Sequence, residues 1–185
     1  MLKIVIFFGL TASGKSTLAE AWAKEQEAGY FNTDRVRKEI VGIQATEHRP
    51  DAVGKGIYSH ELTRETYLTM LDRADELFAK GDKMVVLDGS YAELFERDRV
   101  RQLSARWGAE AVFIFCSCSA EETKRRLNQR SQDLMAVSDG RWEIYQYQLK
   151  TFAYPLEEEQ VIAINTEVEL GSLLAQLSRL PRLHH

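Results

Sequence analysis

The sequence has few of the features that mark secreted, membrane-spanning or disulfide-stabilised proteins. Its 185 residues contain two cysteines, Cys116 and Cys118, which excludes a disulfide scaffold. The apolar run at residues 4–9 is too short to span a membrane. Gly14-Lys15 follows it too closely for a signal-peptide pattern to form. We therefore expect a protein of the cytoplasm with no membrane contact.

Positive charge is not in excess either. Lysine and arginine total 24 against 28 aspartates and glutamates, a formal net charge of −4. This balance disfavours nucleic acid as a general partner, although a local basic pocket remains compatible with it. With 44% apolar residues and no internal repeat, the composition is that of one globular domain. We assign this domain to residues 1–180, and regard 181–185 as a tail that ends in a possible tag remnant.

Continuous apolar runs recur along the chain and predict the fold class. They lie at residues 4–8, 84–87, 111–115 and 161–164, and residues 30–33 form a weaker fifth run. Runs without polar alternation indicate strands that are buried on both faces. The sequence therefore predicts an α/β fold: a doubly wound, five-stranded parallel sheet between two helical layers. Ligands of such sheets bind beyond the carboxyl ends of the strands.

Helices are expected between these runs. Three are predicted at about residues 16–28, 59–80 and 92–107, each ending at a glycine: Gly29, Gly81 and Gly108. Two further helices are expected to begin at capping boxes, Ser119…Glu122 and Thr166…Glu169.

A phosphate-binding loop is predicted directly after the first strand. The segment from Gly9 to Thr17 fits G-x-x-x-x-G-K-[ST] and lies between a strand and a helix. Its amides can surround phosphate oxygens, Lys15 can contact the β- and γ-phosphates, and the Ser16 hydroxyl can bind Mg²⁺. No Asn-Lys-x-Asp run for guanine is present, so ATP is the expected nucleotide. The predicted nucleotide-binding residues are Gly9, Thr11, Ala12, Ser13, Gly14, Lys15, Ser16 and Thr17.

Asp34 follows the second strand, where a γ-phosphate is expected to point. A carboxylate there can accept the proton of an attacking hydroxyl, and Arg37, one helical turn on, can hold an anionic group of the acceptor. The alternative is that Asp34 caps a helix over residues 35–41.

Asp88 ends the third strand and is a second acidic candidate. It is expected either to support Mg²⁺ or to contact the acceptor hydroxyl, and the alternative is a turn aspartate before Gly89. Arg97 lies on the following helix, where it either points back at the acceptor or is exposed.

Arg126 and Arg130 are four residues apart and are predicted to share one helix face. Together with the polar segment after them they are expected to form a lid, at about residues 126–140, whose arginines stabilise charge in the transition state. The aperiodic segment 43–57 is expected to contribute to the acceptor site.

Several other groups favour structural roles. Cys116 and Cys118 are expected to be small buried apolar residues, because too few metal ligands are spaced around them. Glu157-Glu158-Glu159 is expected to be solvated. An aromatic group is expected to pack between helices, although adenine stacking by one member stays open: Trp142, Tyr145, Tyr147 and Phe152.

The combined pattern resembles the polynucleotide-kinase-like P-loop kinases, a group that includes zeta toxins and chloramphenicol phosphotransferase-like enzymes and carries an AAA-type ATP-binding domain. The resemblance rests on Gly9–Thr17, Thr33–Lys38, Asp88 and the two lid arginines, and it covers about residues 2–178. It implies Asp34 as general base, Arg37 as a ligand of an acceptor phosphate, and Arg126 and Arg130 as lid residues.

The sequence thus predicts an ATP- and Mg²⁺-dependent kinase for the hydroxyl of a small-molecule acceptor, with Lys15, Asp34, Arg126 and Arg130 as catalytic residues. Three alternatives stay open at this point: a kinase for nucleic-acid 5′-hydroxyls, an ATP hydrolase or switch with no acceptor, and a toxin that acts on a nucleotide sugar.

Overall fold

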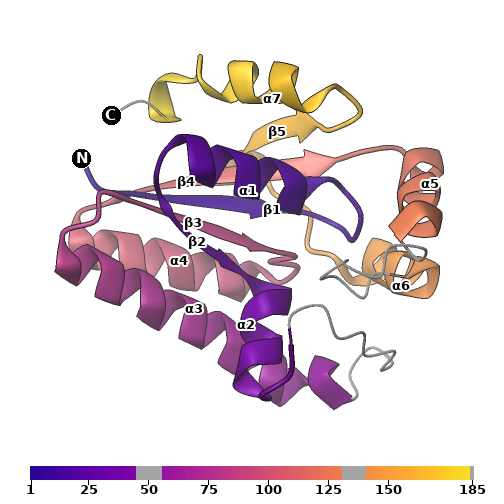
Figure 1. Ribbon diagram of the computed structural model, residues 1–185, viewed down its shortest axis with the longest axis horizontal. Helices are drawn as coiled ribbons and strands as arrows, with labels where there is room; N and C mark the ends of the chain where they lie inside the picture. Colours follow the sequence, from indigo (N-terminus) through magenta and orange to yellow (C-terminus); the bar gives the residue numbers. More distant parts are fainter. Residues whose placement is uncertain (45–55, 131–140, 184–185) are drawn as a thin grey trace.

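The computed structural model describes residues 1–44, 56–130 and 141–183, and it contains one five-stranded sheet (Figure 1). The strands are β1 (Lys3–Phe8), β2 (Gly29–Asn32), β3 (Met84–Gly89), β4 (Glu110–Ser117) and β5 (Ile162–Asn165). Their spatial order is β2-β3-β1-β4-β5, and every neighbouring pair is parallel. The predicted α/β, doubly wound parallel sheet is therefore confirmed.

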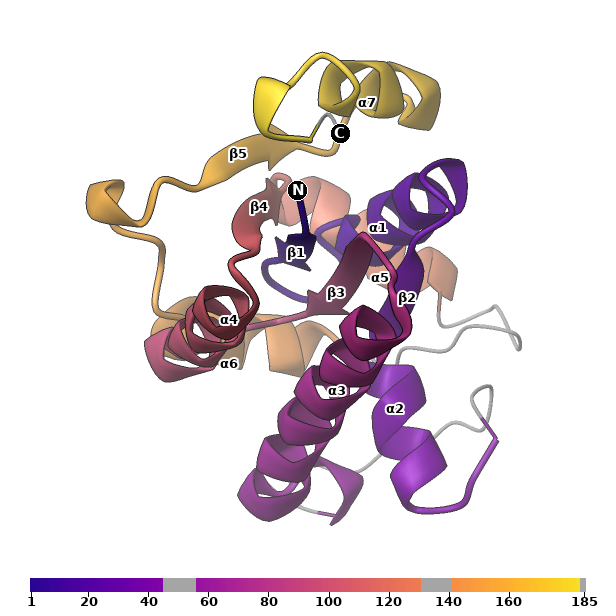
Figure 2. The same ribbon diagram turned by 90° about the vertical axis from the view of Figure 1, so that its left-hand side faces the viewer.

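Helices cover both faces of the sheet and its carboxyl edge. In Figure 1, α1 and α7 lie above the sheet and α3 and α4 below it, while α2, α5 and α6 lie toward the end to which the strands point. Figure 2 shows the two helical layers on either side of the sheet, viewed along the strands. The helices are α1 (Lys15–Glu25), α2 (Thr33–Ile40), α3 (His60–Lys80), α4 (Leu94–Trp107), α5 (Ala120–Arg130), α6 (Trp142–Thr151) and α7 (Leu170–Leu177). Short 3₁₀ turns occupy Gly56–Tyr58, Glu157–Glu159 and Pro181–Leu183.

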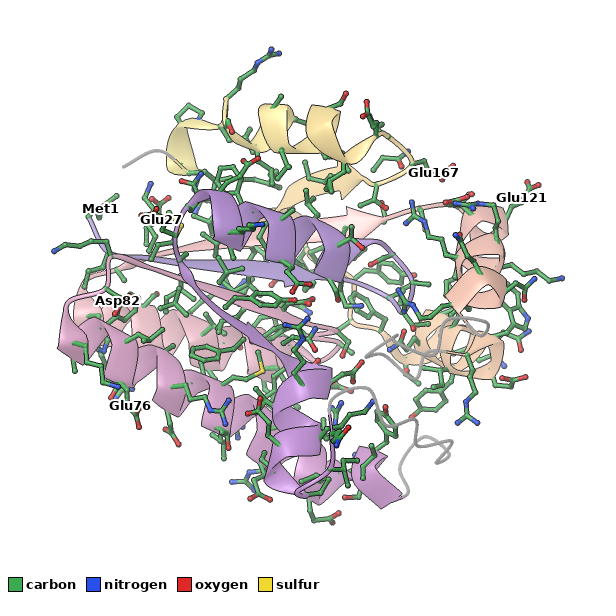
Figure 3. All side chains as sticks on the ribbon, viewed as in Figure 1. Met1, Glu27, Glu76, Asp82, Glu121 and Glu167 are labelled. Atoms are coloured by element: carbon green, nitrogen blue, oxygen red, sulfur yellow. The ribbon has the colours of Figure 1, made fainter. Side chains whose placement is uncertain are left out.

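The central strand β1 shows why the apolar runs do not alternate with polar residues. Ile4, Ile6 and Phe8 belong to the core packed by α3 and α4, whereas Val5 and Phe7 belong to the core packed by α1 and α7. All five are fully buried, and side chains fill the space between the sheet and both helical layers (Figure 3). A strand between two apolar layers must be apolar at every position.

Two of the three predicted helix ends are confirmed and one is wrong. Gly81 (φ 101°) and Gly108 (φ 58°) close α3 and α4 as expected. Helix α1 instead ends at Glu25, and the left-handed residue of the turn is Glu27 (φ 50°). Gly29 opens β2, and a Cβ there would overlap the Cδ1 atom of a leucine on α3. Gly29 is therefore required for close packing of strand and helix, not for ending α1.

Of the two predicted capping boxes, the first is half formed, because the Ser119 amide donates to Glu167 and not to Glu122. The Ser119 hydroxyl accepts a hydrogen bond from the Glu122 amide (3.2 Å) at the start of α5. The second expectation is wrong, because Glu169 is the N-terminal cap of α7. The Thr166 hydroxyl is used elsewhere: it donates to the main-chain oxygen of Ser13 (2.6 Å).

The segment 157–159 also differs from expectation. The side chain of Glu159 is 8% exposed and pairs with two arginines of α4, Arg97 (2.9 Å) and Arg101 (2.7 Å). Burial would raise the pKa of Glu159, but hydrogen bonds from these guanidinium groups lower it to about 2. Glu159 therefore ties the segment before β5 to α4 and is not a solvated residue.

The end of the described chain packs onto the domain. Leu183 is buried, and Arg182 pairs with Glu110 (2.7 Å), so residues 181–183 contribute to the packing and are not a loose tail. Two expectations fall largely outside the described residues: the acceptor loop at 45–55 and the lid segment at 131–140. Among the described residues, no helix is long and apolar enough to cross a bilayer.

Candidate active site

The loop between β1 and α1 has the tightly curled backbone that the motif predicts. Gly9 (φ 144°), Ala12 (φ 57°) and Gly14 (φ 82°) all have positive φ. A Cβ on Gly9 would overlap the main-chain oxygen of Cys116, so this position requires glycine. Residues in this conformation turn successive amides toward the same side, which forms an anion-binding concavity.

The outer side of the loop is held by Arg126 of α5 and by Thr166, which directly follows β5. Arg126 donates to the main-chain oxygen of Ala12 (3.3 Å) and to Thr166, through its hydroxyl (2.9 Å) and main-chain oxygen (2.7 Å). A Cβ on Gly14 would lie 2.7 Å from the Thr166 hydroxyl and 2.8 Å from Arg126 Nη1. Arg126 therefore supports the outer side of the loop through hydrogen bonds in this structure.

Lys15 points back along the loop and donates to the main-chain oxygen of Leu10 (3.2 Å). Burial lowers the pKa of its ammonium group, while the carboxylates of Asp88 and Asp34 act in the opposite direction. Little water surrounds the ammonium group of Lys15 in this position, so its attraction for a phosphate group is stronger than it would be in bulk water.

Asp88, at the end of β3, is fully buried beside the loop. Its Oδ2 accepts hydrogen bonds from Tyr30 (2.8 Å) and Asn32 (2.5 Å), and its Oδ1 has no hydrogen-bond partner in the described chain. Burial raises the pKa of Asp88, and the charge of Lys15 opposes this shift. The carboxylate is thus fixed through one oxygen, and the other remains for an additional ligand.

The structure distinguishes between the two roles predicted for Asp34, a general base and a helix cap. Asn32 caps α2, because its Oδ1 accepts from the amides of Asp34 (3.0 Å) and Arg35 (3.0 Å). The Asp34 side chain does not cap the helix; it pairs with Arg37 (2.8 Å). The Arg37 guanidinium is buried, lies over the ring of Tyr58 at 4.9 Å, and its Nε has no partner in the described chain.

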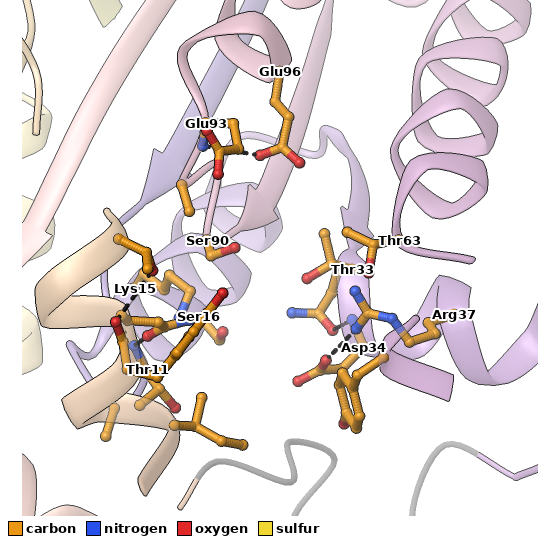
Figure 4. Close-up of a pocket in the computed structure, with 18 of the residues that line it drawn as sticks. Thr11, Lys15, Ser16, Thr33, Asp34, Arg37, Thr63, Ser90, Glu93 and Glu96 are labelled. Carbon is orange, nitrogen blue, oxygen red and sulfur yellow. Dashed lines mark hydrogen bonds and ion pairs between the residues drawn. The ribbon is translucent and has the colours of Figure 1, made fainter. Parts of the chain in front are cut away.

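A cavity of about 470 Å³ joins these groups. Figure 4 shows Lys15 and Ser16 on one side, Asp34 and Arg37 on the opposite side, and Glu96 on a third. Hydroxyl and aromatic side chains complete much of the lining: Thr33, Tyr58, Thr63, Ser90, Phe95, Tyr147 and Thr151. The volume is in the range of sites for small molecules.

A second hollow of about 1130 Å³ lies on the other side of the loop. Its walls come from α1, α5 and the segment between β5 and α7, including Arg126, Arg130 and Val168. Ala12, Gly14 and Ser16 line both hollows, so the loop forms the boundary between them.

The predicted site residues fall into three groups. Most residues of the loop, together with Asp34, Arg37 and Arg130, line the 470 Å³ cavity, and Asp88 is fully buried and does not line it. Arg126 lines the 1130 Å³ hollow. Arg97 does not line either hollow: it is 1% exposed and donates to Glu159 and to the main-chain oxygen of Tyr91 (2.8 Å). We therefore leave Arg97 out of the acceptor site.

Several residues at the site were not predicted. Gln148 accepts a hydrogen bond from the Thr11 amide (2.7 Å), Thr166 supports the loop, and Glu96 lines the cavity. Among the aromatic residues, Tyr145 and Phe152 are buried as expected, whereas Tyr147 is 47% exposed and lines the cavity.

The two cysteines, both predicted to be buried, differ in their exposure to solvent. Cys116 is fully buried, whereas Cys118 is half-buried beside the Thr123 hydroxyl (3.2 Å). The described residues contain no cluster of three or more potential metal-binding histidine, cysteine or acidic side chains.

The sheet order, the curled loop after β1 and the cavity beside it define a P-loop kinase fold. The chain belongs to the AAA_33 family of AAA domains, which matches residues 4–155. It is also 27% identical over 130 residues to uncharacterized proteins of Mycobacterium tuberculosis and Mycobacterium bovis. That match covers 70% of this chain, which spans about a quarter (26%) of the length of those relatives.

Several solved structures with a similar fold are described as kinases. A sugar kinase from Janibacter superimposes with a TM-score of 0.66 at 18% identity, covering 100% of this chain and 99% of that one. A gluconokinase from Sinorhizobium meliloti gives 0.62 at 20% identity, covering 95% and 88%. The APS kinase of Mycobacterium tuberculosis, in complex with AMPPNP and APS, gives 0.66 at 16% identity, covering 96% and 95%. At these identities the likeness establishes the fold.

Proposed function

We propose that this chain is an ATP-dependent kinase that transfers the γ-phosphoryl group to a hydroxyl of a small-molecule acceptor. One observation carries the proposal: Lys15 and Ser16 of the phosphate loop and the carboxylate of Asp34 line opposite sides of the same cavity (Figure 4). The kinases of the same fold, among them a sugar kinase and a gluconokinase, support this assignment. The finer resemblance to polynucleotide kinases and zeta toxins stays a part of the proposal.

The two hollows suggest how the substrates are arranged. The triphosphate lies on the loop amides and α1, where the helix N-terminus and Lys15 attract negative charge. The nucleoside extends into the 1130 Å³ hollow, past Arg126 and Val168. The acceptor occupies the 470 Å³ cavity, with its reacting hydroxyl near Asp34.

Ser16 and Asp88 fit a Mg²⁺ ion. Both supply hard oxygen ligands, and Asp88 Oδ1 is buried without a hydrogen-bond partner in the described chain. When bound there, Mg²⁺ neutralises charge on the β- and γ-phosphate oxygens.

The reaction divides among the chain's own residues. Asp34 accepts the proton of the acceptor hydroxyl as its oxygen forms a bond to the γ-phosphorus, and the bond from that phosphorus to the β–γ bridging oxygen breaks to release ADP. Arg37 holds the Asp34 carboxylate through their 2.8 Å ion pair. Lys15 and Arg130 stabilise the charge that develops on the transferred group.

An acceptor screen with γ-labelled ATP tests this function. Wild-type protein should transfer label to an organic acceptor, and Asp34→Asn should lower turnover by about 10²- to 10⁴-fold while ATP affinity stays unchanged. Asp72→Asn, at an exposed position of α3, is the matched control and should behave as wild type. Label found only in inorganic phosphate would indicate a hydrolase. Normal turnover of the Asp34→Asn variant would exclude Asp34 as the general base.

A further inference from the structure

Glu96 is a buried carboxyl group that lines the proposed acceptor cavity. Glu96 lies in the first turn of α4 and is 7% exposed. Its Oε2 atom accepts a long hydrogen bond from the Glu93 amide (3.4 Å). No ion pair to Glu96 is found among the described residues, although the charges of Arg97 and Arg99 act on it from a greater distance. A carboxylate in such a position requires hydrogen-bond donors, which a ligand can supply.

The position of Glu96 separates it from the reacting groups. Figure 4 shows Glu93 and Glu96 on one side of the cavity, apart from Asp34 and from Lys15. Glu96 therefore reaches a part of the acceptor other than the hydroxyl that attacks. Its function in this arrangement is recognition, not proton transfer.

The charges around the cavity limit what that part of the acceptor can be. At this end of the cavity Glu93 adds negative charge beside Glu96, whereas the lining cations Lys15, Arg37, Arg64 and Arg130 come from other elements, α1, α2, α3 and α5. A carboxylate, sulfate or phosphate group beside Glu96 would meet like charge with little water to screen it. An anionic group is therefore disfavoured at this end of the cavity.

The remaining lining suits hydroxyl groups. Ser90 contributes a hydroxyl oxygen fixed by Tyr67 (3.1 Å), and Thr63 contributes a second hydroxyl from α3. Each of these can both donate and accept a hydrogen bond, as can a hydroxyl of the ligand. The rings of Phe95 and Tyr147 offer apolar surface that matches the carbon–hydrogen faces of a polyol.

We infer that the acceptor is a polyhydroxylated molecule of about monosaccharide size, and that Glu96 binds one of its non-reacting hydroxyl groups at an uncharged end of the molecule. This inference rests on the proposed kinase function and specifies its substrate class. A cavity of about 470 Å³ accommodates such a molecule beside the γ-phosphate.

Acceptor specificity tests the inference. Wild-type protein and γ-labelled ATP are combined with neutral monosaccharides and polyols, the corresponding sugar acids, amino sugars, and oligonucleotides with a free 5′-hydroxyl. The highest kcat/KM should belong to a member of the sugar and polyol series. A preference for an oligonucleotide, or equal rates with alcohols that carry only the reacting hydroxyl, would overturn the inference while leaving the kinase function intact. Label in inorganic phosphate alone would remove the proposed function itself.

A double-mutant cycle then tests Glu96. Glu96→Gln should raise the KM for the acceptor by about 10- to 100-fold, the loss expected when a charged hydrogen bond becomes neutral. A deoxy analogue lacking the recognised hydroxyl should show the same loss with wild-type protein and no additional loss with Glu96→Gln. If every deoxy analogue and Glu96→Gln raised the acceptor KM independently of each other, this role would be contradicted. Glu65→Gln, at an exposed position of α3, is the matched control. The deoxy series on wild-type protein gives an answer even where the variant folds poorly.

Discussion

The main-chain amide of Thr11, in the phosphate loop, donates a 2.7 Å hydrogen bond to the side-chain oxygen of Gln148 on α6. The side-chain nitrogen of Gln148 has no partner in the described chain, and the residue lines the 470 Å³ cavity. Ile144, Tyr147 and Thr151 of the same helix also line it. One side chain therefore connects the loop to the helix that borders the acceptor.

Gln148→Glu should weaken ATP binding. A carboxylate at this position lies beside the loop that receives the triphosphate, and like charges repel strongly where water is scarce. We expect the Kd for ATP, measured by calorimetry with Mg²⁺, to rise about tenfold, which corresponds to about 1.4 kcal/mol. Gln146→Glu, which adds the same charge on the exposed side of α6, should bind ATP as wild type does. Equal affinities for the two variants would show that Gln148 does not influence the nucleotide.

Glu159→Gln should destabilise the fold at neutral pH. The substitution leaves Arg97, which is 1% exposed, without its carboxylate partner, and breaking a buried pair typically costs about 3–5 kcal/mol. Because the pKa of Glu159 is lowered to about 2, its stabilisation is complete above the ordinary carboxyl pKa and is lost as pH falls toward 2.

Urea denaturation at pH 7 and at pH 3 measures this effect. The difference between wild type and Glu159→Gln should be large at pH 7 and smaller at pH 3. Glu157→Gln, on the same 3₁₀ turn but exposed, should match wild type at both. A difference that does not change with pH would contradict the assigned ion pair.

Glu96 should show the opposite pH dependence. Burial raises its pKa from 4.5 to about 7, with Glu93 contributing in the same direction and Arg97 and Arg99 opposing it. From α3, Tyr67 faces it, and the pKa of that phenol is raised. The folded state then holds a proton that the unfolded state releases, so stability falls as pH rises from about 4.5 to 7.

Acceptor binding should follow the ionised form of Glu96. A hydroxyl that donates to the carboxylate binds better once the proton has left, so the KM for the acceptor should fall as pH rises through about 7. Glu96→Gln should remove this step and should be more stable than wild type at pH 8 but not at pH 4. Steady-state kinetics and thermal unfolding across this range provide the measurements, and an unchanged KM profile in Glu96→Gln would refute the assignment.

The sequence alone was sufficient where local rules dominate. The phosphate loop was predicted because a short backbone geometry dictates its glycines, and β1 because a strand covered on both faces is apolar throughout. The sequence also indicated Asp34, but it could not exclude a role for this residue as a helix cap. The structure excludes that role because Asn32 caps the helix.

The remaining parts of the site depend on distant contacts. Gln148 lies 137 residues from Thr11, and Glu159 lies 62 residues from Arg97, so no spacing in the sequence indicates either pair. Glu96 belongs to a helix whose first turn is exposed at Leu94 and Phe95, and only the packing of α4 against the sheet buries it. Thr166 and Glu169 have capping-box spacing, yet hydrogen bonds to Ser13 and Arg126 determine the position of Thr166.

The bond from Thr166 to Ser13 spans 153 residues, and it has a consequence for synthesis on the ribosome. The threonine that supports the loop emerges 153 residues after Ser13. A nascent chain that stops before β5 carries the whole loop motif without this support. The loop therefore gains this hydrogen bond only after β5 has been made and has joined the sheet.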